Sequence, residues 1–214
     1  MSDISNRRAG TEKQDSKEKN PFNIPLAELF MYFALAAIGL LFTGLIIAYV
    51  YASVQMDLTE IRVPNIFHAN TVIILSSSLL LKVGAAFLQK EEYKEYAFSL
   101  FATFTLGIIF IFFQIIGWME LFQSGVTMQE SPSGAYLYLI SGLHLLHIFG
   151  GCVPLAIMAF NAYSANTDIV KELIFSTNPD RFHKFKLLSM YWHFIGILWL
   201  GIYFFFIILN ITVA

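Results

Sequence analysis

Charged residues are scarce in this chain of 214 residues. Asp, Glu, Lys and Arg make up 13% of it, whereas a soluble domain carries about 25%. A fold in water needs charges over its surface, and a chain with 57% hydrophobic residues has too few of them. The scarcity excludes a soluble globular enzyme, a nucleic-acid-binding protein and a disordered chain. It predicts a membrane protein instead.

Cysteine and catalytic motifs are also sparse. The single cysteine, Cys152, lies inside an apolar run, so there is no disulfide framework and the sequence does not indicate a redox compartment. The chain has no Walker loop, no His-Glu-x-x-His and no nucleophile elbow. Its carboxylates and histidines do not line up as a proton relay through a bilayer. These absences favour a structural subunit over a catalyst, so no active site is expected in this chain.

Long apolar segments dominate what is present. Each is longer than the ~20 residues that span a bilayer as a helix, and none alternates with the period of two expected of barrel strands. The segments cover residues 27–53, 69–89, 97–122, 134–163 and 187–211. We therefore predict an all-α, polytopic membrane protein, with a five-helix domain at residues 26–214. Residues 1–25 form a polar tail with nine charges in its first 20 residues and no pattern of a secretory signal.

The positions of Lys and Arg predict the orientation in the membrane. If the five helices alternate in direction, eleven basic residues fall on one side, and the opposite side has only Arg62. Because Lys and Arg are retained on the cytoplasmic side, the N-terminus is expected there and the C-terminus outside. The eleven are Arg7, Arg8, Lys13, Lys17, Lys19, Lys90, Lys94, Lys171, Arg181, Lys184 and Lys186. An even number of helices would destroy this asymmetry.

Polar residues within the apolar segments are candidate sites, since they are expensive in lipid. His144 and His147 are three residues apart on one helix face, and His193 is on the last helix. They could be axial haem ligands, but we predict that they form hydrogen bonds between helices. Gln114 is expected to bind a neighbouring helix. Lys82 either extends its amine to the lipid headgroups or serves an ion pathway.

Several motifs occur in an order that resembles one known family. Residues 142–147 have the pattern Gly-x-His-x-x-His, and residues 191–194 read Tyr-Trp-His-Phe. Further matches lie at residues 42–49, 70–78, 106–114 and 198–200. Together they are similar to subunit III of the haem–copper oxidases (cytochrome c oxidase), in the short five-helix form found in bacteria. The resemblance covers about residues 27–211.

The resemblance implies a non-catalytic subunit of a terminal respiratory oxidase in the bacterial inner membrane. That enzyme couples oxygen reduction to proton translocation. Subunits I and II would be the partners, with haem and copper bound there and none in this chain. Phospholipid would be held in a cleft. The residues taken as structural or lipid-cleft candidates are His144, His147, His193, Trp192, Gln114 and Arg181.

The chain departs from the family pattern at positions where relatives often have a buried carboxylate. Here these positions are Ile38, Gly117 and Gly196, so no proton-carrying role is expected. Quinol instead of cytochrome c as electron donor, and a related subunit of nitric-oxide respiration, stay open. So do membership of a larger respiratory assembly and the helices that contact subunit I. A small stand-alone transporter and a bis-histidine haem protein are alternatives from other classes.

Overall fold

The computed structural model describes residues 25–56, 63–129, 132–166 and 169–213. All regular structure in these ranges is α-helical. The helices are α2 (Leu26–Met56), α3 (Ile66–Gln89), α4 (Tyr93–Gln123), α5 (Pro132–Ala165), α6 (Ile169–Thr177) and α7 (Arg181–Val213). Five of them are long and apolar enough to cross a membrane, which confirms the predicted five-helix membrane fold. Except for residue 25, the predicted tail lies outside the described residues, as does Arg62.

The helices extend beyond the predicted apolar segments. Helix α4 begins at Tyr93 and α7 begins at Arg181, four and six residues before the segments at 97 and 187. Hydropathy detects the stretch that lies in lipid, whereas a helix continues into the interface for as long as its residues favour it. The short helix α6 was not predicted, because nine residues with Lys171 and Glu172 cannot span a bilayer.

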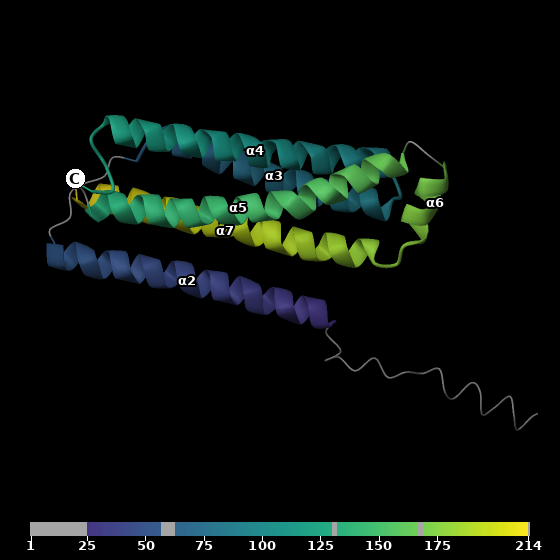
Figure 1. Ribbon diagram of the computed structural model, residues 1–214, viewed down its shortest axis with the longest axis horizontal. Coiled ribbons are helices and arrows are strands. Elements are labelled where there is room, and N and C mark those ends of the chain that lie inside the picture. The colour runs from purple at the N-terminus through teal and green to yellow at the C-terminus, as the bar shows by residue number, and fades with distance from the viewer. Residues whose placement is uncertain (1–24, 57–62, 130–131, 167–168, 214) are drawn as a thin grey trace, which may run out of the picture.

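Four of the long helices form a closed ring. Helix α3 packs on α4, α4 on α5, α5 on α7 and α7 on α3. Successive spans run in opposite directions, so every neighbouring pair in the ring is antiparallel (Figure 1). Helix α6 lies across one end of the ring, between α5 and α7. We call α3, α4, α5 and α7 the four-helix ring.

Helix α2 lies beside the ring and contacts only α5 and α7 extensively (Figure 1). Its large buried side chains, Glu28, Phe42 and Tyr49, are separated by multiples of seven residues. A spacing of seven returns to the same face of a helix after two turns. The helix therefore meets the ring along one narrow stripe, and most of its remaining surface is exposed or only partly covered.

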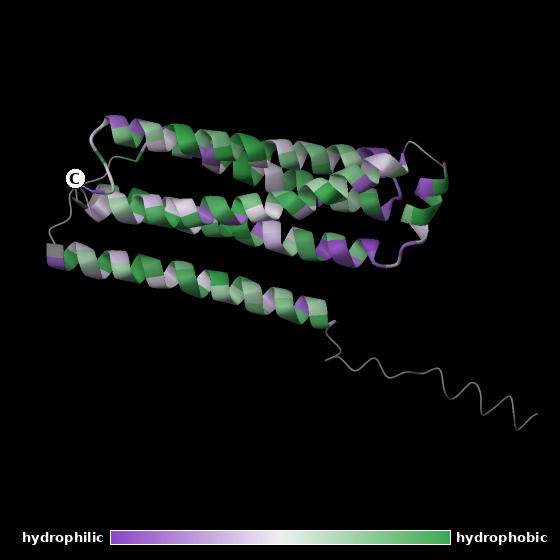
Figure 2. Ribbon diagram, in the orientation of Figure 1, coloured by the Kyte–Doolittle hydropathy of each residue, from purple (hydrophilic) through white to green (hydrophobic). Residues whose placement is uncertain are grey.

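Hydrophilic residues gather at one end of the molecule, as Figure 2 shows by colour. We call it the basic end, because it contains six of the described cations: Lys90, Lys94, Lys171, Arg181, Lys184 and Lys186. Helix α2 begins at the same end. Figure 2 also shows that the helices are mostly hydrophobic between the two ends. This is the charge asymmetry that the sequence indicated. The assignment of this end to the cytoplasm stays a prediction.

Candidate functional site

The three tryptophans hold the ring together in a common way. Each donates its indole N–H to a hydroxyl on a neighbouring helix: Trp192 to Ser77 at 3.0 Å, Trp199 to Thr71 at 3.1 Å and Trp118 to Ser141 at 3.0 Å. Each hydroxyl in turn donates to a carbonyl of its own helix. A hydroxyl can accept and donate at once, so these polar atoms are satisfied inside the membrane domain. The bonds connect α3 with α7, and α4 with α5.

Two glycines make room for the Trp192 ring. A Cβ on Gly107 of α4 would lie 3.0 Å from Trp192 Cη2, and one on Gly151 of α5 would lie 3.2 Å from its Cζ3. The Cβ on Gly151 would also be 2.8 Å from Tyr191 Cε1. Small residues let helices in a membrane approach closely. Trp192, a predicted site residue, is thus a buried packing residue inside the four-helix ring.

Gln114 contacts a neighbouring helix, as predicted. Its Oε1 accepts a hydrogen bond from Asn70 Nδ2 at 3.1 Å, and both side chains are fully buried. The other amide atoms, Asn70 Oδ1 and Gln114 Nε2, have no partner among the described residues. One interhelical hydrogen bond therefore links α3 and α4 at this level of the ring.

The prediction for His144 is wrong. Its ring is fully buried, but neither ring nitrogen has a hydrogen-bond partner in the described part of the chain. Aromatic rings surround it instead, with centroids at 5.1 Å for Trp199, 5.9 Å for Phe110 and 6.4 Å for Phe42. A haem bound through His144 would have to displace at least one of these rings. The sequence located a buried polar residue correctly but not its neighbours.

His147 also differs from its prediction. Its Nδ1 lies 2.6 Å from the carbonyl of Leu143 on its own helix, so this bond is not interhelical. The link to α7 runs through the backbone, because Tyr191 Oη donates to the His147 carbonyl at 2.9 Å. His193 is half-buried on α7. The structure does not bring the three predicted histidines into one hydrogen-bonded group.

Arg181 is the centre of a cluster at the basic end. It is 8% exposed and donates to Tyr93 Oη at 2.7 Å and to Glu91 Oε1 at 3.0 Å. Its guanidinium also lies over the rings of Tyr93 and Phe182, at 5.4 and 4.8 Å from their centroids. These contacts join the start of α7 to the start of α4 and to the loop between α3 and α4. They fix the guanidinium in one position.

A second ionic cluster attaches α2 to α7 at the same end. Lys186 Nζ lies 2.8 and 2.9 Å from the two oxygens of Glu28, and His183 Nδ1 lies 3.4 Å from Glu28 Oε1. The Glu28 side chain is only 10% exposed, whereas the Lys186 side chain is 54% exposed. The two partners are 158 residues apart in the chain, so this pairing depends on the tertiary packing of α2 against α7.

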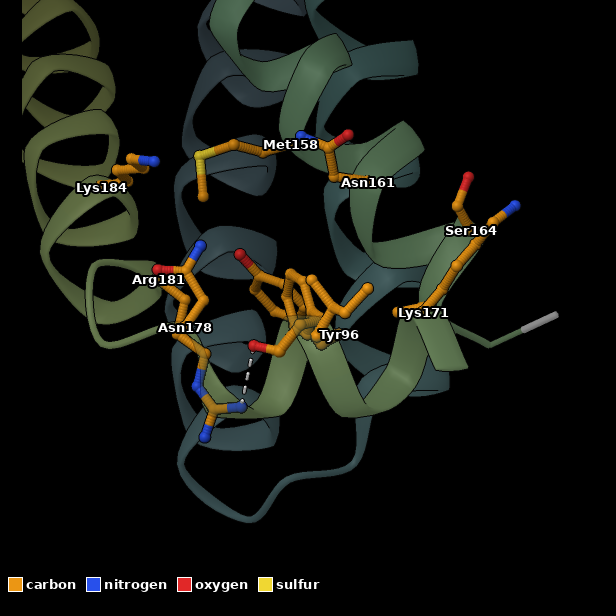
Figure 3. Close-up of a pocket in the computed structure, with 11 residues that line it drawn as sticks. Tyr96, Met158, Asn161, Ser164, Lys171, Asn178, Arg181 and Lys184 are labelled. Carbon is orange, nitrogen blue, oxygen red and sulfur yellow. Dashed lines mark hydrogen bonds between the residues drawn. The ribbon is translucent and has the colours of Figure 1, made fainter. Parts of the chain in front are cut away.

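A cavity of about 310 Å³ opens beside Arg181 (Figure 3). Its apolar lining includes Tyr96, Met158 and Phe175. The three cations that line it are Lys171, Arg181 and Lys184, and its lining contains no carboxylate among the described residues. Figure 3 shows Arg181 with a hydrogen bond to the carbonyl of Phe175, at 3.5 Å. The cavity combines an apolar interior with a basic rim.

Sequence reasoning missed this cavity because half of its lining comes from α6 and the residues after it. The nine-residue helix has no span signal, although Pro179 two residues after its end is a typical stop. Metal ligands were not predicted. Among the described residues, no group of three or more His, Cys, Asp or Glu side chains could hold a metal ion.

Comparison with known proteins points to one protein family. Residues 27–211 match the family model described as cytochrome c oxidase subunit III. Cytochrome c oxidase subunit 3 of Danio rerio is 26% identical over 134 residues, 63% of this chain and 46% of that protein. Cytochrome c oxidase subunit 3 of Rhipicephalus sanguineus is 28% identical over 134 residues, 63% of this chain and 47% of that protein. A probable cytochrome c oxidase subunit 3 of Nocardia farcinica is 23% identical over 133 residues, 62% and 61% of the two chains. The match thus spans less than two thirds of each of these relatives.

Proposed function

The chain belongs to the cytochrome c oxidase subunit III family, and we propose that it serves as the non-catalytic subunit III of a terminal haem–copper oxidase. Subunits I and II of that complex would be its partners and would hold the haem and copper. The observation that carries the proposal is the family match over nearly the whole five-helix membrane domain. The oxidase would reduce oxygen and translocate protons across a bacterial inner membrane.

The buried polar residues support a scaffold role. Trp192, Trp199, Trp118 and Gln114 use their polar atoms to join helices of the ring. Such hydrogen bonds stabilise a helix bundle in lipid by about 1 kcal/mol each. A rigid ring of this kind can present a constant surface to a catalytic neighbour. The N-terminus would face the cytoplasm, with the basic end on that side.

We further propose that the cavity beside Arg181 binds a phospholipid headgroup. An anionic phosphate would meet Lys171, Arg181 and Lys184 at the rim, while acyl carbons would contact Met158 and Phe175. Arg181 is held in place by Tyr93 and Glu91, so little freedom would be lost on binding. Cations at the cytoplasmic face of a membrane attract anionic lipid.

The oxidase proposal is tested by purifying the tagged chain from its native membrane in mild detergent. We expect haem-containing subunits in the preparation by mass spectrometry, and a haem spectrum in proportion to the chain. Oxygen uptake with reduced cytochrome c, compared with uptake with a quinol, identifies the electron donor. A preparation in which the chain is abundant and haem is absent would contradict the proposal.

The lipid proposal needs a separate measurement. The double variant Lys171→Gln and Lys184→Gln removes two exposed cations from the cavity rim and leaves Arg181 with its contacts. We expect less phospholipid phosphorus per haem in the purified complex. The control is Lys94→Gln, an exposed cation at the same end that does not line the cavity. Equal phospholipid in the two preparations would show that the cavity is not a headgroup site.

A further inference from the structure

Lys82 is an exposed cation on the outer surface of α3, within the apolar span. It lies seven residues before the end of the helix at Gln89, a distance of about 10 Å. A charge in an apolar span is costly unless it is paired or reaches water, and such residues mark functional sites by default. Lys82 therefore needs an explanation that the four-helix ring itself does not supply.

The surroundings of Lys82 come from the packing of α3 on α7. Gly196 of α7 lies against α3, because a Cβ there would be 3.2 Å from Ser78 Oγ. Lys82 is one turn beyond Ser78, and His193 is one turn before Gly196. Since the two helices are antiparallel, both residues lie on the side of that contact that faces the basic end. Three hydrogen-bond donors thus gather on one face: Lys82, Ser78 and His193.

The directions of the side chains bring Lys82 and His193 closer together. The hydrogen bond between Trp192 and Ser77 sets the register, so Lys82 is nearer the basic end than His193. Side chains lean toward the N-terminus of their own helix. Because α3 and α7 are antiparallel, this tilt points the Cα–Cβ bonds of Lys82 and His193 toward each other along the helix axes.

This face has donors but no acidic side chain. Neither α3 nor α7 contains Asp or Glu, and Lys82 belongs to none of the ion pairs among the described residues. Around it are exposed apolar side chains, including Leu75, Leu79 and Val83. The arrangement is a cation with two neighbouring hydrogen-bond donors, set in an apolar surface.

We propose that the outer face of α3 and α7 docks a transmembrane helix of a partner chain, and that this helix carries an Asp or Glu at the depth of Lys82. The carboxylate pairs with Lys82 Nζ and accepts hydrogen bonds from Ser78 Oγ and the His193 ring. Leu75, Leu79 and Val83 contact the apolar side chains of the same helix. A carboxylate has lone pairs for all three donors, and an ion pair in an apolar setting fixes the depth and rotation of the docked helix. The inference concerns a partner of stated chemistry and does not depend on that partner being an oxidase subunit.

The test places a photo-crosslinking amino acid, p-benzoylphenylalanine, at Leu79 in the native membrane. Leu79 is exposed and lies one turn from Lys82, so the ion pair stays intact. We expect one crosslinked membrane protein, whose crosslinked peptide contains an Asp or Glu within an apolar span. A crosslink to lipid alone, no crosslinked protein, or a peptide without such a carboxylate would overturn the proposal.

Substitutions at Lys82 then test the charge. Lys82→Met removes the cation at similar length, and we expect the crosslink yield to fall about tenfold. Lys82→Arg keeps the cation and should keep most of the yield. Lys94→Met, an exposed cation outside the face, is the matched control. Insertion of the chain is not at risk, because the change to Met makes the span more apolar. A Lys82→Met variant that crosslinks as well as the unchanged chain would overturn the proposal.

The same preparations separate this inference from the oxidase proposal. A haem spectrum reports the oxidase, and the crosslink reports the docking face. A haem-containing complex that gives only lipid crosslinks would overturn the docking face and leave the oxidase role intact. A crosslinked carboxylate helix in a complex without haem would support the docking face and contradict the oxidase role.

Discussion

Helix α2 and the four-helix ring both consist of long apolar helices, yet they differ in how each is attached. In the most apolar stretch of α2, 11% of the residues are buried, whereas 33% are buried in the corresponding stretch of each helix of the four-helix ring. The ring is joined by indole, amide and hydroxyl hydrogen bonds between helices. Helix α2 is joined by Phe42 and Tyr49 and by the Glu28 ion pair at one end. The comparison predicts that α2 separates from the ring at a lower free energy than the ring unfolds.

The largest expected effect comes from two phenylalanines that contact the same histidine. Phe110 of the ring and Phe42 of α2 are both almost fully buried and both meet His144 edge-on. Replacing a buried Phe by Ala removes about 3 kcal/mol of stability. We expect Phe110→Ala to lower the melting temperature of the ring, followed by tryptophan fluorescence in detergent. Phe42→Ala should instead release α2, followed by energy transfer between dyes on α2 and α5. Equal loss of ring stability in both variants would contradict the distinction.

A second pair of variants compares close packing in the two regions. Gly151→Leu places a side chain where its Cβ already lies 2.8 Å from Tyr191, and overpacking of this kind costs about 1–3 kcal/mol. Gly44→Leu in α2 has no atom within 4 Å of the new Cβ. We expect a lower melting temperature for the first variant and little change for the second. A similar loss in both would mean that α2 is packed as tightly as the ring.

The indole hydrogen bonds give a smaller effect. The variants Trp192→Phe and Ser77→Ala, singly and together, form a double-mutant cycle across the contact between α3 and α7. The coupling energy should be about 1 kcal/mol, as for hydrogen bonds between membrane helices. Unfolding in a denaturing detergent measures it. A coupling energy near zero would mean that Trp192 stabilises the four-helix ring mainly through the packing of its indole and not through its hydrogen bond.

The smallest effect on the ring should come from the ion pair of α2. Glu28→Gln removes the charge that binds Lys186, and an ion pair with one exposed partner contributes little to stability because solvent screens it. We expect faster hydrogen exchange in the first turns of α2 and an unchanged melting temperature of the ring. Glu95→Gln, an exposed carboxylate at the start of α4, is the control. If the ring melted earlier in the Glu28 variant, α2 would be an integral part of it.

Much of the fold followed from the sequence, because bilayer thickness and the placement of Lys and Arg constrain it strongly. The number and order of the five spans were predicted correctly, but each predicted segment is shorter than the helix that contains it. The interior was less accessible. Gln114 was expected to contact a neighbouring helix and does. The neighbours of His144, in contrast, are aromatic rings from α2, α4 and α7, which the sequence did not indicate. A sequence shows that a residue is polar and lies in an apolar span, but not which side chains the tertiary packing brings to it.

The side-chain contacts at the basic end also could not be predicted from the sequence. Arg181 was identified as a candidate from its charge and position, but its partners Tyr93 and Glu91 are about 90 residues earlier. Helix α6 was missed because its nine residues are too few to give a span signal. Its Phe175 nevertheless packs on Tyr93, with ring centroids 5.3 Å apart. Short interfacial helices give no periodic signal long enough to be recognised.

The narrow stripe of α2 has a consequence for synthesis at the ribosome. Its contacts are with α5 and α7, so the surfaces that receive it emerge about 100 residues later, and α7 last of all. During that interval α2 has to stay in lipid without these protein neighbours. Its span is the most apolar of the five described, which suits a helix that is inserted well before the helices on which it packs. The order of synthesis therefore favours an α2 span that is stable in lipid by itself.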